Sequence, residues 1–300
     1  METERPSPRY SGIDLWSSSD VLDAMIESQF AAVAAVRAAR SAIEDAVHAM
    51  EVRLAEVGRL IYAGAGTSGR LAVQDGAELM PTFSWPSDRL VLLIAGGEEA
   101  LLHAVEGAED QIEHAHEEIA RHALISDDVL IAAAASGTTP FTLACLRRAK
   151  SAGALTVGIA NNPGTPLLAE ADHPILLDTG PEPIAGSTRM KAGTAQRIAM
   201  NLLSSLLMIR LGRVYEGLMV DVQASNRKLA KRSEDMLRHL TGRTGDEARN
   251  ALSAADGSVK LAVLLLHGCR AEEARALLER NAGHLRAALA ELRASRMAPE

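Results

Sequence analysis

The sequence predicts an α/β protein, namely a doubly wound parallel sheet with N-terminal helices and a small C-terminal helical domain. Five short apolar runs alternate with amphipathic segments long enough to be crossover helices, which is typical of parallel strands buried on both faces. Hydrophobic residues make up 47% of the 300-residue chain, enough for a large core. Aromatic residues make up only 3%, which favours helices packed closely on a sheet over a base-stacking surface.

The net charge of the chain limits the classes of partner that it can bind. The net charge is −8, so the field of the whole protein would repel nucleic acid, and a small anionic substrate must be held by local donors. The chain does not open on a charged segment followed by an apolar one, and its most apolar run, residues 198–209, is too short to span a bilayer. We therefore expect a cytoplasmic protein with neither a nucleic-acid nor a membrane partner.

The first predicted region, residues 1–57, combines an arm with helices. Residues 1–13 are rich in Pro, Ser and Arg and show no period, so they form either an ordered arm or a loose tail. From residue 20 to residue 57 apolar side chains recur at helical spacing, which predicts one long helix or a helical pair.

The second predicted region, residues 58–213, carries the sheet. Its predicted strands are residues 60–63, 90–95, 129–134, 155–159 and 175–177. Because ligands of such sheets bind beyond the carboxyl ends of the strands, the loops at those ends are where we expect the chemistry.

A glycine-rich turn follows the first predicted strand. It includes Gly66, Thr67 and Ser68, and two further glycines flank these residues. Glycines allow a sharp turn, and the following helix offers free N–H groups to an anion. The third glycine falls at Gly69 and no lysine follows it, so neither the dinucleotide pattern nor the P-loop pattern fits well, and the turn predicts a site for a sugar phosphate.

A second polar loop follows the third predicted strand. Ser136, Gly137 and Thr138 precede Pro140, which suits the first turn of a helix, so hydroxyls and N–H groups again face the strand ends. Ordinary helix capping explains each loop alone but makes their joint placement a coincidence.

A third hydroxyl-rich segment opens a long apolar helix that runs to about Leu211. It contains Ser187, Arg189 and Lys191. Cations at a helix start oppose the helix dipole, so an anion bound there is the more economical explanation.

The third predicted region, residues 214–300, is helical. We expect the strands to stop at Val214, a basic helix over residues 226–232, and short amphipathic helices to about Leu292. This domain could serve the substrate, a partner or a neighbouring subunit.

Carboxylates supply the candidates for acid–base chemistry. Glu78 lies in an apolar stretch near the end of the helix that follows the first loop, where partial burial would raise its pKa; the alternative is a solvated helix end. A second group holds Glu106, Glu109 and Asp110, and spacing alone does not choose among them.

Two other groups of residues are predicted to carry no chemistry. His114 and His116 diverge on a helix, so we expect no metal site there. The cysteines, Cys145 and Cys269, have no second cysteine nearby and are predicted to be buried free thiols.

The three loops together resemble the sugar isomerase (SIS) fold. The longer strings GAGTSGRL, AVEGAED, GSTRMKAGTAQ and LMVDV.ASN.KL..R closely resemble the N-acetylmuramic acid 6-phosphate etherase family, from about residue 3 to about residue 290. The family's usual D-A-S-E-C-P-P-T is here D-G-A-E-L-M-P-T, which retains the acid in an altered setting.

The resemblance implies a lyase without a cofactor that cleaves the D-lactyl ether of an amino sugar phosphate during cell-wall sugar recycling. By motif, the family's acid–base pair falls on Glu78 and Glu109, which leaves Glu106 as a solvated residue. The substrate-binding residues it implies are Gly66, Thr67, Ser68, Ser136, Gly137, Thr138, Ser187, Arg189 and Lys191.

Helix geometry adds a constraint. A helix from Ser68 to Glu78 spans roughly 15 Å, too far for one hexose to bridge. Either the helix bends or the carboxylate serves a neighbouring subunit, so we expect a homodimer with a shared active site. The alternatives are a sugar-phosphate-binding regulatory protein, resembling the glucokinase regulatory protein, and an aldose–ketose isomerase of the same fold.

Overall fold

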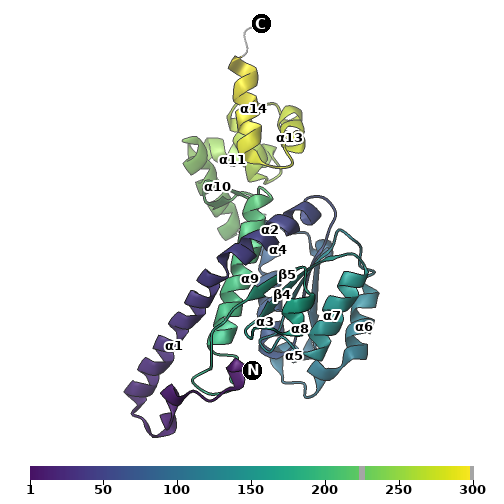
Figure 1. The fold of residues 1–300 in the computed structure, drawn as a ribbon. Helices are drawn as coiled ribbons and strands as arrows, with labels where there is room; N and C mark the ends of the chain where they lie inside the picture. Colours follow the sequence, from purple (N-terminus) through teal and green to yellow (C-terminus); the bar gives the residue numbers. More distant parts are fainter. Residues whose placement is uncertain (223–226, 298–300) are drawn as a thin grey trace. The chain divides into compact units, whose positions relative to one another are not determined.

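The structure is a computed structural model that describes residues 1–222 and 227–297. It divides the chain into two compact units (Figure 1). The first unit holds residues 1–77 and 87–205, and the second holds residues 78–86 and the chain from residue 206 onward. The division into three regions predicted from the sequence, residues 1–57, 58–213 and 214–300, stays a prediction.

A five-stranded parallel sheet forms the centre of the first unit. Its strands are β1 (Leu60–Gly64), β2 (Leu90–Ile94), β3 (Val129–Ala133), β4 (Leu155–Ala160) and β5 (His173–Leu176). Their order is β2-β1-β3-β4-β5, and each neighbouring pair is parallel. All five apolar runs are strands, so the predicted doubly wound sheet is confirmed. The strand order reverses between β1 and β3, which is the switch point where such sheets bind ligands.

Helices cover both faces of this sheet. One face packs against α2 (Arg40–Leu54) and α3 (Gly66–Ala77), and α3 lies so close that a methyl group on Gly76 would meet the Leu92 side chain. The other face packs on a core that includes Ile61, Leu130 and Phe141. The helices on that side are α6 (Ile112–Arg121), α7 (Pro140–Ser151) and α8 (Pro166–Glu170). Short α5 (Glu99–Leu102) follows β2.

The N-terminal region is an ordered arm followed by a helical pair, α1 (Ser18–Ala38) and α2, so one of the two predicted alternatives holds at each place. The arm makes three short 3₁₀ turns, Glu2–Glu4, Pro8–Tyr10 and Ile13–Leu15. It is fixed at Thr3, a fully buried residue whose hydroxyl accepts a 2.9 Å hydrogen bond from the amide of Asn162.

The second unit is mainly helical. Its core is built on α10 (Arg227–Thr241), α11 (Gly245–Ala254), α12 (Val259–Leu266), α13 (Ala271–Arg280) and α14 (Leu285–Met297). The expectation that strands stop at Val214 is wrong, because β6 (Val214–Tyr215) and β7 (Leu218–Met219) form a small antiparallel pair. The glycine between them, Gly217, has φ of +74°, which permits the tight reversal. The predicted basic helix is part of α10, while its first residue, Asn226, lies outside the described residues.

Long α9 (Lys191–Arg210) belongs to the first unit up to residue 205. Neither it nor any other helix in the described part of the chain is long and apolar enough to cross a membrane. Cys145 and Cys269 are buried free thiols, as predicted, and burial raises the pKa of Cys145 to about 12.

Candidate functional site

The first predicted phosphate loop lies directly beyond β1. Gly66 begins α3 with φ of +53°, and Ser68 is buried in its first turn. A methyl group on Gly69 would lie 2.7 Å from the carbonyl oxygen of Gly64, so the helix starts in direct contact with the strand end. Glycine is therefore favoured at Gly66 by its positive φ and at Gly69 by this close approach, and together they aim the free N–H groups of α3 beyond the sheet.

The second loop lies beyond β3, the neighbouring strand. Gly137 has φ of +68°, and a methyl group there would lie 2.2 Å from Oγ1 of Thr165. The N–H of Thr138 donates to Oγ of Ser136 over 3.2 Å, and α7 begins at Pro140 as predicted. Since Gly64 and Ala133 are paired in the sheet, the two loops emerge side by side.

The third segment leads into α9, and its helix start already holds an anion that belongs to the chain. The carboxylate of Glu182, which is 1% exposed, accepts hydrogen bonds from the N–H groups of Lys191 at 3.3 Å and Ala192 at 2.9 Å. The sequence argument expected a bound anion to explain the cations at this helix start. The structure instead supplies an internal carboxylate there.

Burial shifts the pKa values of Glu182 and Lys191 in opposite directions. Burial raises the pKa of Glu182, while the two backbone hydrogen bonds and the nearby Lys191 oppose that rise. Burial likewise lowers the pKa of Lys191, which is 5% exposed, and the charges of Glu182 and Asp178 oppose that fall. Arg189 is exposed, so of the two predicted cations it is the freer to meet a ligand.

Two asparagines after β4 connect these segments. Asn162 donates to the carbonyl of Ala135 in the second loop at 2.8 Å and to the buried arm at Thr3. Asn161 accepts from Gln196 of α9 at 2.9 Å. The backbone N–H of Gly186 donates to the carbonyl of Thr3 at 3.0 Å, so the arm also braces the third segment.

The third segment also approaches the first loop. A methyl group on Gly193 would lie 3.4 Å from Cγ2 of Thr67. The structure therefore brings the three segments that carry the residues predicted to bind the substrate to one edge of the sheet, at its switch point. These residues are Gly66, Thr67, Ser68, Ser136, Gly137, Thr138, Ser187, Arg189 and Lys191.

Glu109 lies in the loop that follows β2, at the same edge of the sheet. It is exposed on the short turn Ala108–Asp110, which is anchored by buried Ala108. The same loop is tied to the first phosphate loop, because Arg70 of α3 donates to the carbonyls of Ala100 at 2.8 Å and His103 at 2.9 Å.

Glu78 differs from the sequence expectation. Helix α3 ends at Ala77, and Glu78 is the N-cap residue of a separate short helix, α4 (Leu79–Phe83). The side chain is exposed, so of the two alternatives predicted for it the solvated helix end holds. Glu78 belongs to the second unit and Glu109 to the first, so their pairing in one active site stays a prediction.

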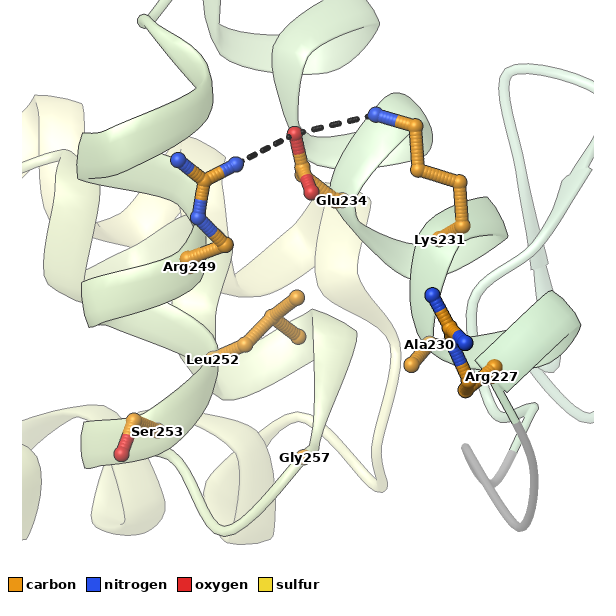
Figure 2. A pocket seen from close by; sticks show the side chains of 8 residues that line it. All are labelled: Arg227, Ala230, Lys231, Glu234, Arg249, Leu252, Ser253 and Gly257. Carbon is orange, nitrogen blue, oxygen red and sulfur yellow. Dashed lines mark hydrogen bonds and ion pairs between the residues drawn. The ribbon is translucent and has the colours of Figure 1, made fainter.

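A cavity of about 740 Å³ in the second unit contains none of the predicted site residues. Figure 2 shows Glu234 accepting from Lys231 at 3.1 Å and from Arg249 at 3.0 Å across its upper wall. The cavity has three basic side chains, Arg227, Lys231 and Arg249. Because Lys231 and Arg249 already pair with Glu234, their attraction for a bound anion is weakened.

Comparison with known proteins identifies the family. The model of the glucokinase regulatory protein N-terminal SIS domain matches residues 35–150, and the SIS domain model matches residues 111–206. The N-acetylmuramic acid 6-phosphate etherase of Deinococcus radiodurans is 52% identical over 290 residues, covering 96% of this chain and 95% of the relative. The etherase of Streptomyces coelicolor is 45% identical, covering 97% and 94%.

The chain belongs to the N-acetylmuramic acid 6-phosphate etherase family. A solved structure with the same fold, a candidate phosphosugar isomerase from Bacteroides fragilis, has a TM-score of 0.50 and 20% identity, covering 65% of this chain and 94% of that one. At this identity the likeness shows the fold alone.

Sequence reasoning missed several residues of this etherase-family site. Glu182, Asn161, Asn162 and Thr3 hold the loops together, yet none belongs to a recognised loop motif. The one available signal was the Asn161–Asn162 pair directly after an apolar strand, because a buried strand end is followed by polar side chains that must find partners.

Proposed function

We propose that this chain cleaves the D-lactyl ether of N-acetylmuramic acid 6-phosphate to give N-acetylglucosamine 6-phosphate and D-lactate, in cell-wall amino sugar recycling. One observation carries the proposal: hydroxyl-bearing loops converge at the switch point of the sheet, in a chain that matches etherases over nearly its whole length. No cofactor is needed for this reaction.

The reaction is an elimination followed by addition of water. Ring opening exposes an aldehyde at C1 that acidifies the proton on C2. One carboxylate removes this proton while another protonates the departing lactate oxygen at C3, and water then adds to the unsaturated sugar. The two carboxyl groups must be in opposite protonation states, as in other paired-carboxylate enzymes. We assign Glu109 as the C2 base and Glu78 as the proton donor.

Binding and chemistry divide between the loops and the glutamates. Hydroxyls of Thr67, Ser68, Ser136 and Thr138, with the N–H groups at the starts of α3 and α7, would hold the phosphate. Arg189 and Lys191 would meet the phosphate or the lactate carboxylate. The free thiols, Cys145 and Cys269, agree with a cytoplasmic setting, where thiols stay reduced.

The decisive experiment supplies purified protein with N-acetylmuramic acid 6-phosphate and measures D-lactate. We expect lactate from the wild type and release slower by about 10² to 10⁴-fold from Glu78→Gln and from Glu109→Gln. Incubation in D₂O separates their roles: Glu78→Gln should still exchange the C2 proton for deuterium, and Glu109→Gln should not. A wild type that binds the sugar phosphate without releasing lactate would overturn the proposal in favour of a regulatory protein, and aldose–ketose conversion would favour an isomerase.

We also propose a homodimer with a shared site. On α1 the side chains of Leu22, Ile26, Phe30 and Val33 are between 56% and 70% exposed. They repeat at helical spacing and form one apolar stripe, which suits an identical stripe on a second copy. Mixing Glu78→Gln with Glu109→Gln protein should restore lactate release in mixed dimers. Failure to restore it, or full activity in a monomeric Phe30→Arg variant, would contradict a shared site.

A further inference from the structure

The second unit contains the segment that bears Glu78. Residues 78–86 pack with the chain beyond residue 206, and within this segment Glu78 occupies the N-cap position of α4 without a capping hydrogen bond from its side chain. A helix of five residues has little stability of its own, since nucleation costs more than so few hydrogen bonds return. What holds α4 therefore decides where the Glu78 carboxyl lies.

Arg213 holds the far end of α4. Its Nη1 donates to the carbonyl oxygens of Phe83 at 2.8 Å and Ser84 at 3.0 Å. Carbonyls at a helix end have no partner within the helix, and a cation there also complements the helix dipole. The guanidinium lies 5.2 Å from the ring centre of Trp85, itself only 1% exposed, so one side chain fixes three successive residues.

Asp221 supports Arg213 from the LMVDV string. Its carboxylate lies 3.8 Å from Nη1 of Arg213 and accepts a 2.7 Å hydrogen bond from Nζ of Lys260, a residue 6% exposed on α12. The backbone carbonyl of Asp221 accepts a further hydrogen bond from the hydroxyl of Ser84. Burial and the charge of Arg213 lower the pKa of Lys260, and the charge and hydrogen bond of Asp221 oppose this fall, so Asp221 partly offsets the cost of placing two cations here.

We propose that Arg213, supported by Asp221 and Lys260, is a positioning residue that orients Glu78 for proton donation, so the helical second unit takes part in the reaction. This inference rests on the proposed function. The link is short, because five residues of helix between Arg213's contacts and Glu78 span about 7.5 Å. It gives the LMVDV string a role that the sequence left open.

The test measures lactate release by Arg213→Gln and Arg213→Lys, with circular dichroism to verify folding. We expect kcat to fall about 10²-fold in Arg213→Gln with KM changed less than about threefold, because misplacement by about 1 Å has this cost. Arg213→Lys, which keeps the charge, should recover part of the loss. Arg286→Gln is the matched control: Arg286 pairs with Glu216 and stacks on Tyr215 but contacts nothing in residues 78–86 among the described residues.

Coupling to Glu78 separates positioning from general destabilisation. Since Arg213 acts through Glu78, the Glu78→Gln/Arg213→Gln double variant should be no slower than Glu78→Gln alone. Unchanged kcat in both Arg213 variants, or additive losses in the double variant, would overturn the inference. Absence of lactate release by the wild type would instead overturn the proposed function, so the two failures are distinguishable.

Discussion

The two edges of the same parallel sheet differ in how their polar groups are satisfied. At the amino ends of the strands, Asp128 is fully buried and accepts from Arg59 at 2.6 Å and from the N–H of Ile125 at 2.9 Å. Asp172 accepts from Thr156 and pairs with Lys150 at 2.8 Å. Ionic groups at this edge therefore form closed networks that stabilise the fold.

The carboxyl edge is incompletely satisfied. Among the described residues, the buried hydroxyls of Thr165 and Thr179 have no hydrogen-bond partner. The buried carboxylate there, Glu182, has a raised pKa because burial dominates. At the other edge, burial would raise the pKa of Asp128, but bonds from Arg59 and Ile125 lower it below its usual range. Unused polar capacity marks the edge where a ligand is expected, at some cost in stability.

The largest expected effect is on activity at the carboxyl edge. Glu109→Gln should lower kcat by about 10² to 10⁴-fold, the range for loss of a general base. Because Glu109 is exposed, the free energy of unfolding should change by less than about 0.5 kcal/mol. Steady-state kinetics and urea denaturation of the same preparation check both statements. A loss of stability that matches the loss of activity would contradict the division between the edges.

At the amino edge, substitutions should lower the stability of the fold and leave kcat unchanged. Asp128→Asn should destabilise the fold by about 3 kcal/mol, because it leaves a largely buried Arg59 without its charge partner. Asp172→Asn, in a pair that is 33% and 48% exposed, should cost about 1 kcal/mol or less. The urea midpoint measures both changes, and kcat of the folded fraction should stay at the wild-type value. Equal costs for the two variants would show that burial does not set the strength of these pairs.

Each edge of the sheet has a glycine with positive φ, so the same Gly→Ala substitution can be compared at both edges. Gly137→Ala should cost more than the strain of about 1 to 2 kcal/mol, because the new methyl group would meet Thr165 at 2.2 Å. Gly153, at the amino edge, has φ of +83° but only an ordinary 3.5 Å contact with Ser126, so Gly153→Ala should show the strain alone. Calorimetry gives the stabilities. We also expect KM to rise only in Gly137→Ala. If KM rose in both variants, the rise would not be an effect of the phosphate loop.

The smallest effect is a difference in the sign of a pH dependence. The pKa of Glu182 is raised, so between its ordinary value of 4.5 and its folded value the folded state binds more protons, and stability falls as pH rises through that window. The pKa of Asp128 is lowered, so its contribution is present above 3.8 and is lost as pH falls through the folded value. Urea denaturation of wild type, Glu182→Gln and Asp128→Asn across pH measures both. Slopes of equal sign would contradict the assigned environments.

Local pattern was sufficient for the strands and the two glycine loops. Apolar runs of about five residues are buried on both faces wherever the sheet places them, and Gly66 and Gly137 both adopt the positive φ that a turn requires. The hairpin Val214–Met219 was missed because two-residue strands have too few positions to show a period.

The sequence by itself determined the parallel sheet, the family and the identity of the polar loops, because each depends on residues adjacent in the chain. Tertiary structure alone decided that Glu182 occupies the start of α9, that Asn161 and Asn162 join loops far apart in sequence, and that α3 ends before Glu78. Those features depend on burial and on hydrogen bonds between distant segments. Such partners are selected by the packing of the folded chain and leave no periodic signal in the sequence.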